Sequence, residues 1–199
     1  MPQLAVHQLR VGAVCKIVAE NFCKEVDVQY ITKLGLVHDM GNIVKFDLAN
    51  RNEELYGKVK GVEHWVEIQK TYWQKYGHDA HQATVAILTE AGLGEYIPDL
   101  NAEAELYFAE STTQELEQAS PGAVILMYAD CRVSPRGVVP YRERIDDLVE
   151  RYGGGKTDTW RDSMVEFEKY IERATSTDLM MVSEVSANEL FDQLLLMPI

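Results

Sequence analysis

The sequence predicts an all-α fold arranged as a single-domain helical bundle. Apolar residues recur at three- and four-residue steps over most of the chain, as they do on one face of a helix. Ser, Gly and Pro stand where helices begin and end, and the alternating pattern of strands is nearly absent. With 199 residues, 46% of them hydrophobic, the chain can bury a real core and fits one domain.

The net charge and the absence of long apolar runs argue against a nucleic-acid-binding protein and against a membrane protein. A net charge of −13 argues against binding to a nucleic acid polymer, because such binding needs clustered Lys and Arg. No apolar run approaches the roughly 18 to 20 residues of a membrane span, and the first residues lack the pattern of a signal peptide. The three cysteines, Cys15, Cys23 and Cys131, cannot all pair with one another, and none lies in a Cys-x-x-Cys motif. The sequence therefore suggests neither a disulfide framework nor a thiolate zinc site. We therefore expect a cytoplasmic protein with no membrane partner.

Two helices are expected near the N-terminus. Between residues 4 and 22 apolar side chains follow a helical period, and His7 falls on the same stripe and should point inward. A second run, residues 28–40, stops at Gly41-Asn42, because both residue types tolerate the left-handed dihedrals that end helices. The pair His38-Asp39 then lies in the last turn of this helix.

The middle of the chain predicts a loop and two further helices. Residues 44–64 are polar and irregular, with the length of a lid over a site. Residues 65–76 and 78–91 have helical patterns, and His78 and His81 share one face of the second helix. The aromatic residues of this region are expected to pack between helices rather than stack on bases: Trp65, Tyr72, Trp73 and Tyr76.

A buried helix is expected in the second half of the chain. A capping-box spacing at Ser111 and Gln114 opens a stretch that reaches the strongly apolar residues 123–129 and ends at Asp130. A loop with Pro and Gly follows at residues 134–137. Two more helices are expected, at residues 141–152 and 157–174.

The tail, residues 175–199, is rich in Met and Leu. A second capping-box spacing, at Ser186 and Glu189, predicts a short helix with one apolar face. We expect this face to pack back on its own domain, and a dimer seam is the alternative. The chain is therefore expected to be a monomer or a homodimer.

Four residues with metal-binding side chains stand out: His7, the pair His38-Asp39, and Asp130. Imidazole nitrogen and carboxylate oxygen are ligands that divalent Mn, Fe, Mg, Zn or Ni accept, and ligand softness does not choose among these ions. Ligands from separate segments can leave positions open for water and substrate. The sequence thus predicts a divalent metal ion in a hydrolytic site.

Other residues are candidates for contact with a phosphate group. His78 and His81 could steady the phosphate or protonate a leaving oxygen, and surface positions are an equal alternative. If both were metal ligands, the site would hold two ions. Arg132 and Arg136 offer forked donors, with solvent exposure or salt bridges as the alternative, and Lys45 follows the His-Asp turn.

The order His, His-Asp, Asp over an all-helical chain resembles the HD superfamily of metal-dependent phosphohydrolases. The segment Leu36-Val-His-Asp-Met-Gly41 is similar to the signature of that family, and Tyr128-Ala-Asp130 is similar to its closing segment. Residues 81–88 resemble a helix that, in some members, aims a His at the substrate phosphate or a second metal. The resemblance spans about residues 7–152. It departs from many members at Asn42, where they carry Lys, and the acidic pair of alarmone hydrolases is missing.

The resemblance implies an HD-type domain over residues 1–155, with residues 156–199 as a C-terminal helical extension packed on the same domain. It implies hydrolysis of a phosphate ester in a nucleotide or another small phosphorylated metabolite by a metal-activated water. Asp39, His78 and His81 would be the catalytic residues. A non-catalytic nucleotide- or metal-binding regulatory module of the same fold is the first alternative. A helical scaffold that assembles through its tail is the second.

Overall fold

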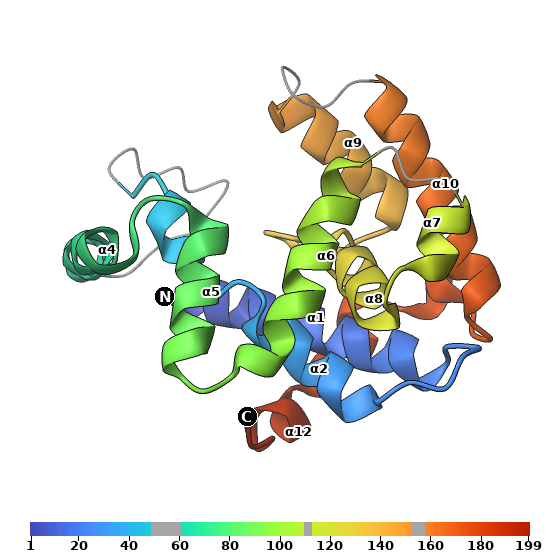
Figure 1. Cartoon of the computed structure of the whole chain (residues 1–199), viewed down its shortest axis with the longest axis horizontal. Helices are drawn as coiled ribbons and strands as arrows, with labels where there is room; N and C mark the ends of the chain where they lie inside the picture. Colours follow the sequence, from blue (N-terminus) through green and yellow to red (C-terminus); the bar gives the residue numbers. More distant parts are fainter. Residues whose placement is uncertain (49–60, 110–112, 153–157) are drawn as a thin grey trace.

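The computed structural model describes residues 1–48, 61–109, 113–152 and 158–199 (Figure 1). Its α-helices are α1 Pro2–Glu20, α2 Val28–Val37, α4 Val62–Tyr76, α5 Ala80–Glu90, α6 Ile97–Phe108, α7 Thr113–Gln118, α8 Pro121–Asp130, α9 Tyr141–Tyr152, α10 Asp158–Ala174, α11 Glu184–Asn188 and α12 Phe191–Leu195. Short 3-10 helices are η1 Asn42–Lys45, η2 Gly94–Tyr96 and η3 Leu179–Met181, and an antiparallel hairpin pairs β1 Val133–Ser134 with β2 Gly137–Val138. The predicted all-α class is confirmed. Over the described residues, no helix has both the length and the apolar character to cross a bilayer.

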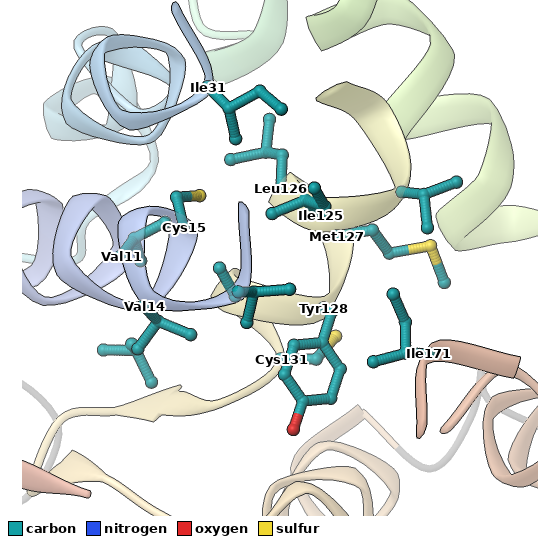
Figure 2. Close-up of a cluster of buried hydrophobic side chains, with 14 of the residues drawn as sticks. Val11, Val14, Cys15, Ile31, Ile125, Leu126, Met127, Tyr128, Cys131 and Ile171 are labelled. Carbon is teal, nitrogen blue, oxygen red and sulfur yellow. The ribbon is translucent and has the colours of Figure 1, made fainter. Parts of the chain in front are cut away.

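Helix α8 lies at the centre of the core. Its residues 122–129 are all buried, because apolar side chains cover every face of this helix. Ser120 caps the helix by accepting a hydrogen bond from the Ala123 N–H, and a Pro in the first turn favours the same start. Asp130 ends the helix, as the sequence predicts. Figure 2 shows the buried cluster around α8, to which α1, α2 and α10 contribute Val11, Ile31 and Ile171.

Helices α1 and α2 touch backbone to backbone at two glycines. A Cβ on Gly35 would lie 3.0 Å from the Cα of Gly12 and 2.8 Å from the Sγ of Cys15. The rings of His7 and His38 also meet, with centroids 5.3 Å apart, so the two helices run antiparallel. At 1.5 Å per residue, the two histidines lie about 7.5 Å and about 4.5 Å beyond the glycine contact, toward the same end. The glycine contact therefore brings the two imidazoles together.

Gly41 is required by a close approach, and the prediction that it ends the helix through left-handed dihedrals is wrong. Its φ of −88° and ψ of −6° lie in the right-handed region. A Cβ there would lie 2.7 Å from the carbonyl oxygen of Ala80 and would also clash with the backbone nitrogen of Thr84. The Gly41 N–H donates a hydrogen bond to the Thr84 hydroxyl at 2.9 Å. The turn that carries His38 and Asp39 is thus docked against α5.

Replacing Gly41 by alanine is expected to lower the free energy of unfolding by about 3 kcal/mol, because the new methyl group meets backbone atoms that cannot move aside. Urea denaturation measures this change. Gly94→Ala is the matched control, since nothing lies within 4 Å of a Cβ at that position. Equal denaturation midpoints for the two variants would contradict the close contact.

A second, smaller apolar cluster joins α4, α5 and η1, and Figure 1 shows α4 and α5 to one side of α1 and α2. Its buried members are Ile43, Val44 and Ala83, and the four aromatic residues of α4 pack against them, as predicted. The Trp73 indole donates a hydrogen bond to the Val44 carbonyl at 2.8 Å. The buried Gln69 amide donates to the carbonyls of Ile43 and Phe46 at 2.6 and 2.7 Å. Hydrogen bonds from α4 side chains therefore fix the backbone of residues 43–46, which follow Asp39.

Several elements differ from the sequence prediction. Helix α6 was not predicted, although its residues pack along α8, and the Ser120 hydroxyl hydrogen-bonds to Asp99 there. The β1–β2 hairpin occupies the region predicted as a loop, and α4 begins at Val62 rather than at Trp65. Most of the predicted lid, residues 49–60, and the predicted cap residue Ser111 lie outside the described residues.

In the C-terminal segment, residues 176–199, helices α11 and α12 both pack against α1. The cap of α11 is Ser183, whose hydroxyl accepts from the Ser186 N–H, while the Ser186 hydroxyl accepts from the Ser183 N–H. The predicted box at Ser186 and Glu189 is wrong by one turn, because Glu189 closes this short helix instead. Large apolar side chains of this segment are exposed: Met180, Met181, Val185, Leu195, Leu196 and Ile199.

Candidate metal centre

The predicted metal ligands meet at one end of the core, and we call these four residues the His/Asp cluster. His7 comes from α1, His38 and Asp39 from the turn after α2, and Asp130 from the end of α8. The Nε2 atom of His7 lies 3.3 Å from Oδ2 of Asp39 and 3.1 Å from Oδ1 of Asp130. The Nε2 atom of His38 lies 3.6 Å from each of the same two oxygens. Residues up to 123 positions apart in sequence therefore converge on one point.

The two histidines face the carboxylates with their Nε2 atoms and form ion pairs rather than hydrogen bonds with them. Both Nε2 atoms are buried, and neither has a hydrogen-bond partner among the described residues. The Nδ1 atom of His38 lies 2.8 Å from the Gly35 carbonyl oxygen. A proton on Nδ1 satisfies this carbonyl and leaves the Nε2 lone pair free for a cation.

The spacing of the ligand atoms fits a divalent cation. Ligands bound at about 2.0–2.2 Å in tetrahedral or octahedral geometry lie about 2.8–3.6 Å apart along the edges of the polyhedron. The four N–O distances in the cluster run from 3.1 to 3.6 Å. His7, His38 and Asp39 alone also form a group of donor atoms close enough to hold one ion.

Without a cation the cluster is a set of coupled charges. Burial by itself would lower the pKa of His38, but the negative charges of Asp39 and Asp130 raise it to about 9. Burial by itself would raise the pKa of Asp39, but the charges of His38 and Lys45 lower it to about 2. The pKa of Asp130 also lies well below its usual value, because the two histidines outweigh the effect of burial. Protons and a metal ion would therefore compete for the same nitrogens.

The structure does not bring His78 or His81 into the His/Asp cluster. The Nε2 atom of His81 lies 2.8 Å from the side-chain oxygen of Asn101 on α6, so these two residues form a hydrogen bond between α5 and α6. The exposed ring of His78 packs on Trp73, with centroids 5.0 Å apart. Each of these histidines therefore links two neighbouring segments of the chain.

Arg132 has a structural role in addition to the predicted contact with a substrate. Its guanidinium is buried. The Nε–H donates to the Val139 carbonyl at 2.6 Å, and Nη1 donates to the Tyr128 hydroxyl at 2.6 Å and the Leu179 carbonyl at 3.0 Å. Nη2 donates to the Val182 carbonyl at 2.6 Å. These hydrogen bonds use four of the five N–H donors of the side chain.

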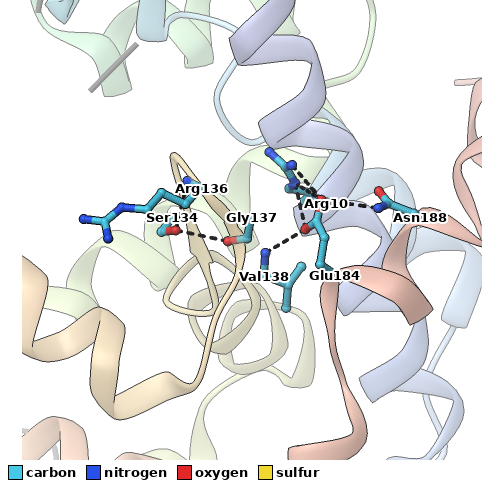
Figure 3. Close-up of polar contacts among 7 residues, drawn as sticks. All are labelled: Arg10, Ser134, Arg136, Gly137, Val138, Glu184 and Asn188. Atoms are coloured by element: carbon cyan, nitrogen blue, oxygen red, sulfur yellow. Dashed lines mark hydrogen bonds and ion pairs between the residues drawn. The ribbon is translucent and has the colours of Figure 1, made fainter. Parts of the chain in front are cut away.

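The other two residues predicted to bind phosphate, Arg136 and Lys45, lie on the surface. Arg136 is exposed in the turn between β1 and β2, and Figure 3 shows its side chain pointing away from the neighbouring polar contacts of Glu184. Lys45 is the last residue of η1 and is exposed. Its positive charge helps to lower the pKa of Asp39. Lys45 therefore contributes positive charge to the surroundings of Asp39.

Two further residues near the cluster were not predicted. Glu103 on α6 is partly buried, and burial, followed by the negative charge of Asp130, raises its pKa to about 8. It lies one helical turn after Asp99, on the face of α6 that meets α8. Gln3 lies one turn before His7, and its buried Oε1 has no hydrogen-bond partner among the described residues. The sequence prediction misses Glu103 because it misses helix α6, although Pro98 and Asp99 in the first turn are typical of a helix start.

No protein family model, curated protein or solved structure matches this chain. The fold and the cluster define its class: an all-α protein with a candidate metal-binding group of histidine and aspartate residues.

Proposed function

We propose that this protein is a metal-dependent phosphohydrolase of the HD type, which cleaves a phosphate ester bond in a nucleotide or another small phosphorylated metabolite. One observation carries the proposal. Two buried imidazole nitrogens without hydrogen-bond partners face the same two carboxylates, which come from distant segments. Without a cation these nitrogens have only ion pairs with the two carboxylates, and a bound cation would satisfy the nitrogens and the carboxylate oxygens together.

The His/Asp cluster would hold the ion, and its donor set accepts Mn, Fe, Mg, Zn or Ni. Such an ion supplies a bound water of lowered pKa and a positive charge beside a phosphoryl oxygen. The protein fixes the ligands in advance: the hydrogen bond between His38 and Gly35 orients one ring, and the docking of Gly41 on α5 holds the turn.

Lys45 and Glu103 are the residues we assign to the substrate. The exposed ammonium of Lys45 would attract the phosphate group, in a chain whose net charge of −13 otherwise repels anions. Glu103 would carry a proton at neutral pH and could give it to the leaving oxygen. Burial is the largest cause of its raised pKa, and burial remains when a cation neutralises the neighbouring carboxylates.

Hydrolysis of a panel of phosphate esters tests the proposal. The panel contains an aryl phosphate, a bis-aryl phosphate and the common nucleotides, each assayed with Mn²⁺ and with a chelator. We expect turnover that requires the metal and falls at least about 100-fold in His38→Ala and Asp39→Ala. In the same assay, Glu103→Gln should lower kcat and keep the affinity for Mn²⁺, because the amide cannot donate the proton as an acid does. Metal binding without turnover on any ester would favour the regulatory binding module instead.

A further inference from the structure

The C-terminal segment is tied to α1 by an arginine close to a candidate ligand. Arg10 lies three residues after His7, and its Nε donates to both carboxylate oxygens of Glu184 at 3.0 Å. Its Nη2 donates to Oε1 of the same carboxylate at 2.6 Å (Figure 3). The Val138 N–H donates to Oε2 of Glu184 at 2.8 Å, so the carboxylate also holds strand β2. The pKa of Glu184 is lowered, because these donors outweigh the effect of burial.

A second arginine ties the same segment to the end of α8. Arg132 lies two residues after Asp130, and it donates hydrogen bonds to the carbonyls of Leu179 and Val182. Its Nε donates to the Val139 carbonyl, which follows β2 directly. The buried guanidinium thus fixes the start of the C-terminal segment and the hairpin to the helix that ends in a candidate ligand.

A glycine in the β1–β2 hairpin leaves room for the Glu184 carboxylate. Gly137 has a φ of +134°, which disfavours a side chain. A Cβ on Gly137 would lie 2.7 Å from Oε2 of Glu184. The backbone of the hairpin therefore approaches the carboxylate as closely as it does because no side chain intervenes.

We infer that residues 179–184 brace the candidate metal centre, and that Glu184 is a positioning residue for it. The segment binds one arginine beside His7 and another beside Asp130, so it fixes α1 relative to the end of α8 and sets the separation of two ligands. Metal ligands must be held to about 0.5 Å, so residues that fix the helices carrying the ligands can tune the affinity for the ion. The inference rests on the metal site of the proposed function and concerns metal binding, not the reaction.

Titration with Mn²⁺ by calorimetry tests the brace, at a temperature where circular dichroism shows each variant folded. Glu184→Ala should weaken Mn²⁺ binding about tenfold, because Arg10 loses its partner and α1 gains freedom relative to α8. Glu184→Gln should weaken it less, because the amide oxygen still accepts a hydrogen bond. The absorption spectrum of the Co²⁺-substituted protein should also change in Glu184→Ala, since it reports ligand geometry.

Glu168→Ala is the matched control. Glu168 on α10 forms an ion pair of 2.6 Å with Arg142 on α9, and this pair links no ligand-bearing helix. The control should bind Mn²⁺ as the unmodified protein does. Unchanged affinity and an unchanged Co²⁺ spectrum in Glu184→Ala would overturn the brace, as would an equal loss in Glu168→Ala. Hydrolysis is not measured here, so failure to cleave any ester counts against the proposed function alone, whereas absence of Mn²⁺ binding in the unmodified protein overturns both.

Discussion

Replacing His7 by alanine is expected to weaken Mn²⁺ binding more than about 100-fold, since changes outside the coordination sphere alone cost 10–100-fold. Asp130→Asn should have an effect of the same order. An amide oxygen occupies the same place but lacks the charge that a divalent cation needs. Calorimetric titration of the two variants and of the unmodified protein measures the change.

Two histidine variants serve as controls for this result. His81 hydrogen-bonds to Asn101 and His78 packs on Trp73, so alanine at either position should leave the affinity for Mn²⁺ within about twofold. A loss of affinity in His81→Ala as large as that in His7→Ala would place His81 among the ligands. It would contradict the arrangement of α5 and α6 described above.

The pH dependence of metal binding follows from the raised pKa of His38. In the metal-free protein His38 carries a proton up to a pH of about 9, so a cation must displace it. The affinity for Mn²⁺ should therefore rise about tenfold per pH unit between pH 6.5 and 9 and level off above that range. Titrations in buffers of constant ionic strength check this slope, and a flat profile over the range would contradict it.

The stability of the metal-free protein should change in the opposite direction. The raised pKa of His38 stabilises the fold below pH 6.5, and this contribution is lost as the pH rises through 9, a loss of about 3 kcal/mol in the free energy of unfolding. The lowered pKa of Asp39 stabilises the fold above pH 3.8, and that contribution is lost as the pH falls toward 2. The raised pKa of Glu103 acts the other way, because this carboxyl removes stability as the pH rises from 4.5 toward 8. Urea denaturation in the presence of a chelator should thus show greatest stability at about pH 4 to 4.5. In His38→Ala the decline above pH 6.5 should be smaller.

Local patterns in the sequence were sufficient for the fold class and for helices α1 and α8 of the His/Asp cluster, whereas α2 ends at Val37 and leaves the predicted last-turn pair His38-Asp39 in the turn that follows. The apolar period placed His7 on the inward face of α1, and the run of apolar residues before Asp130 predicted a helix buried on all sides. These features depend on neighbours three or four positions away, and hydrophobic spacing and caps report such neighbours directly. Side-chain chemistry and the resemblance to a known pattern predict the convergence of the four residues, and in the structure they lie together.

The tertiary structure alone decided what several of the other polar residues contact. Arg132 is predicted to face a substrate, and two of its donors bind carbonyls about fifty residues further along the chain. Gly41 was expected to adopt left-handed dihedrals, yet its lack of a side chain serves a contact with α5. Glu103 could not be predicted at all, because its position beside the cluster depends on how α6 packs against α8. Hydrogen bonds and close contacts between distant segments depend on the packing of helices, and no local pattern in the chain encodes them.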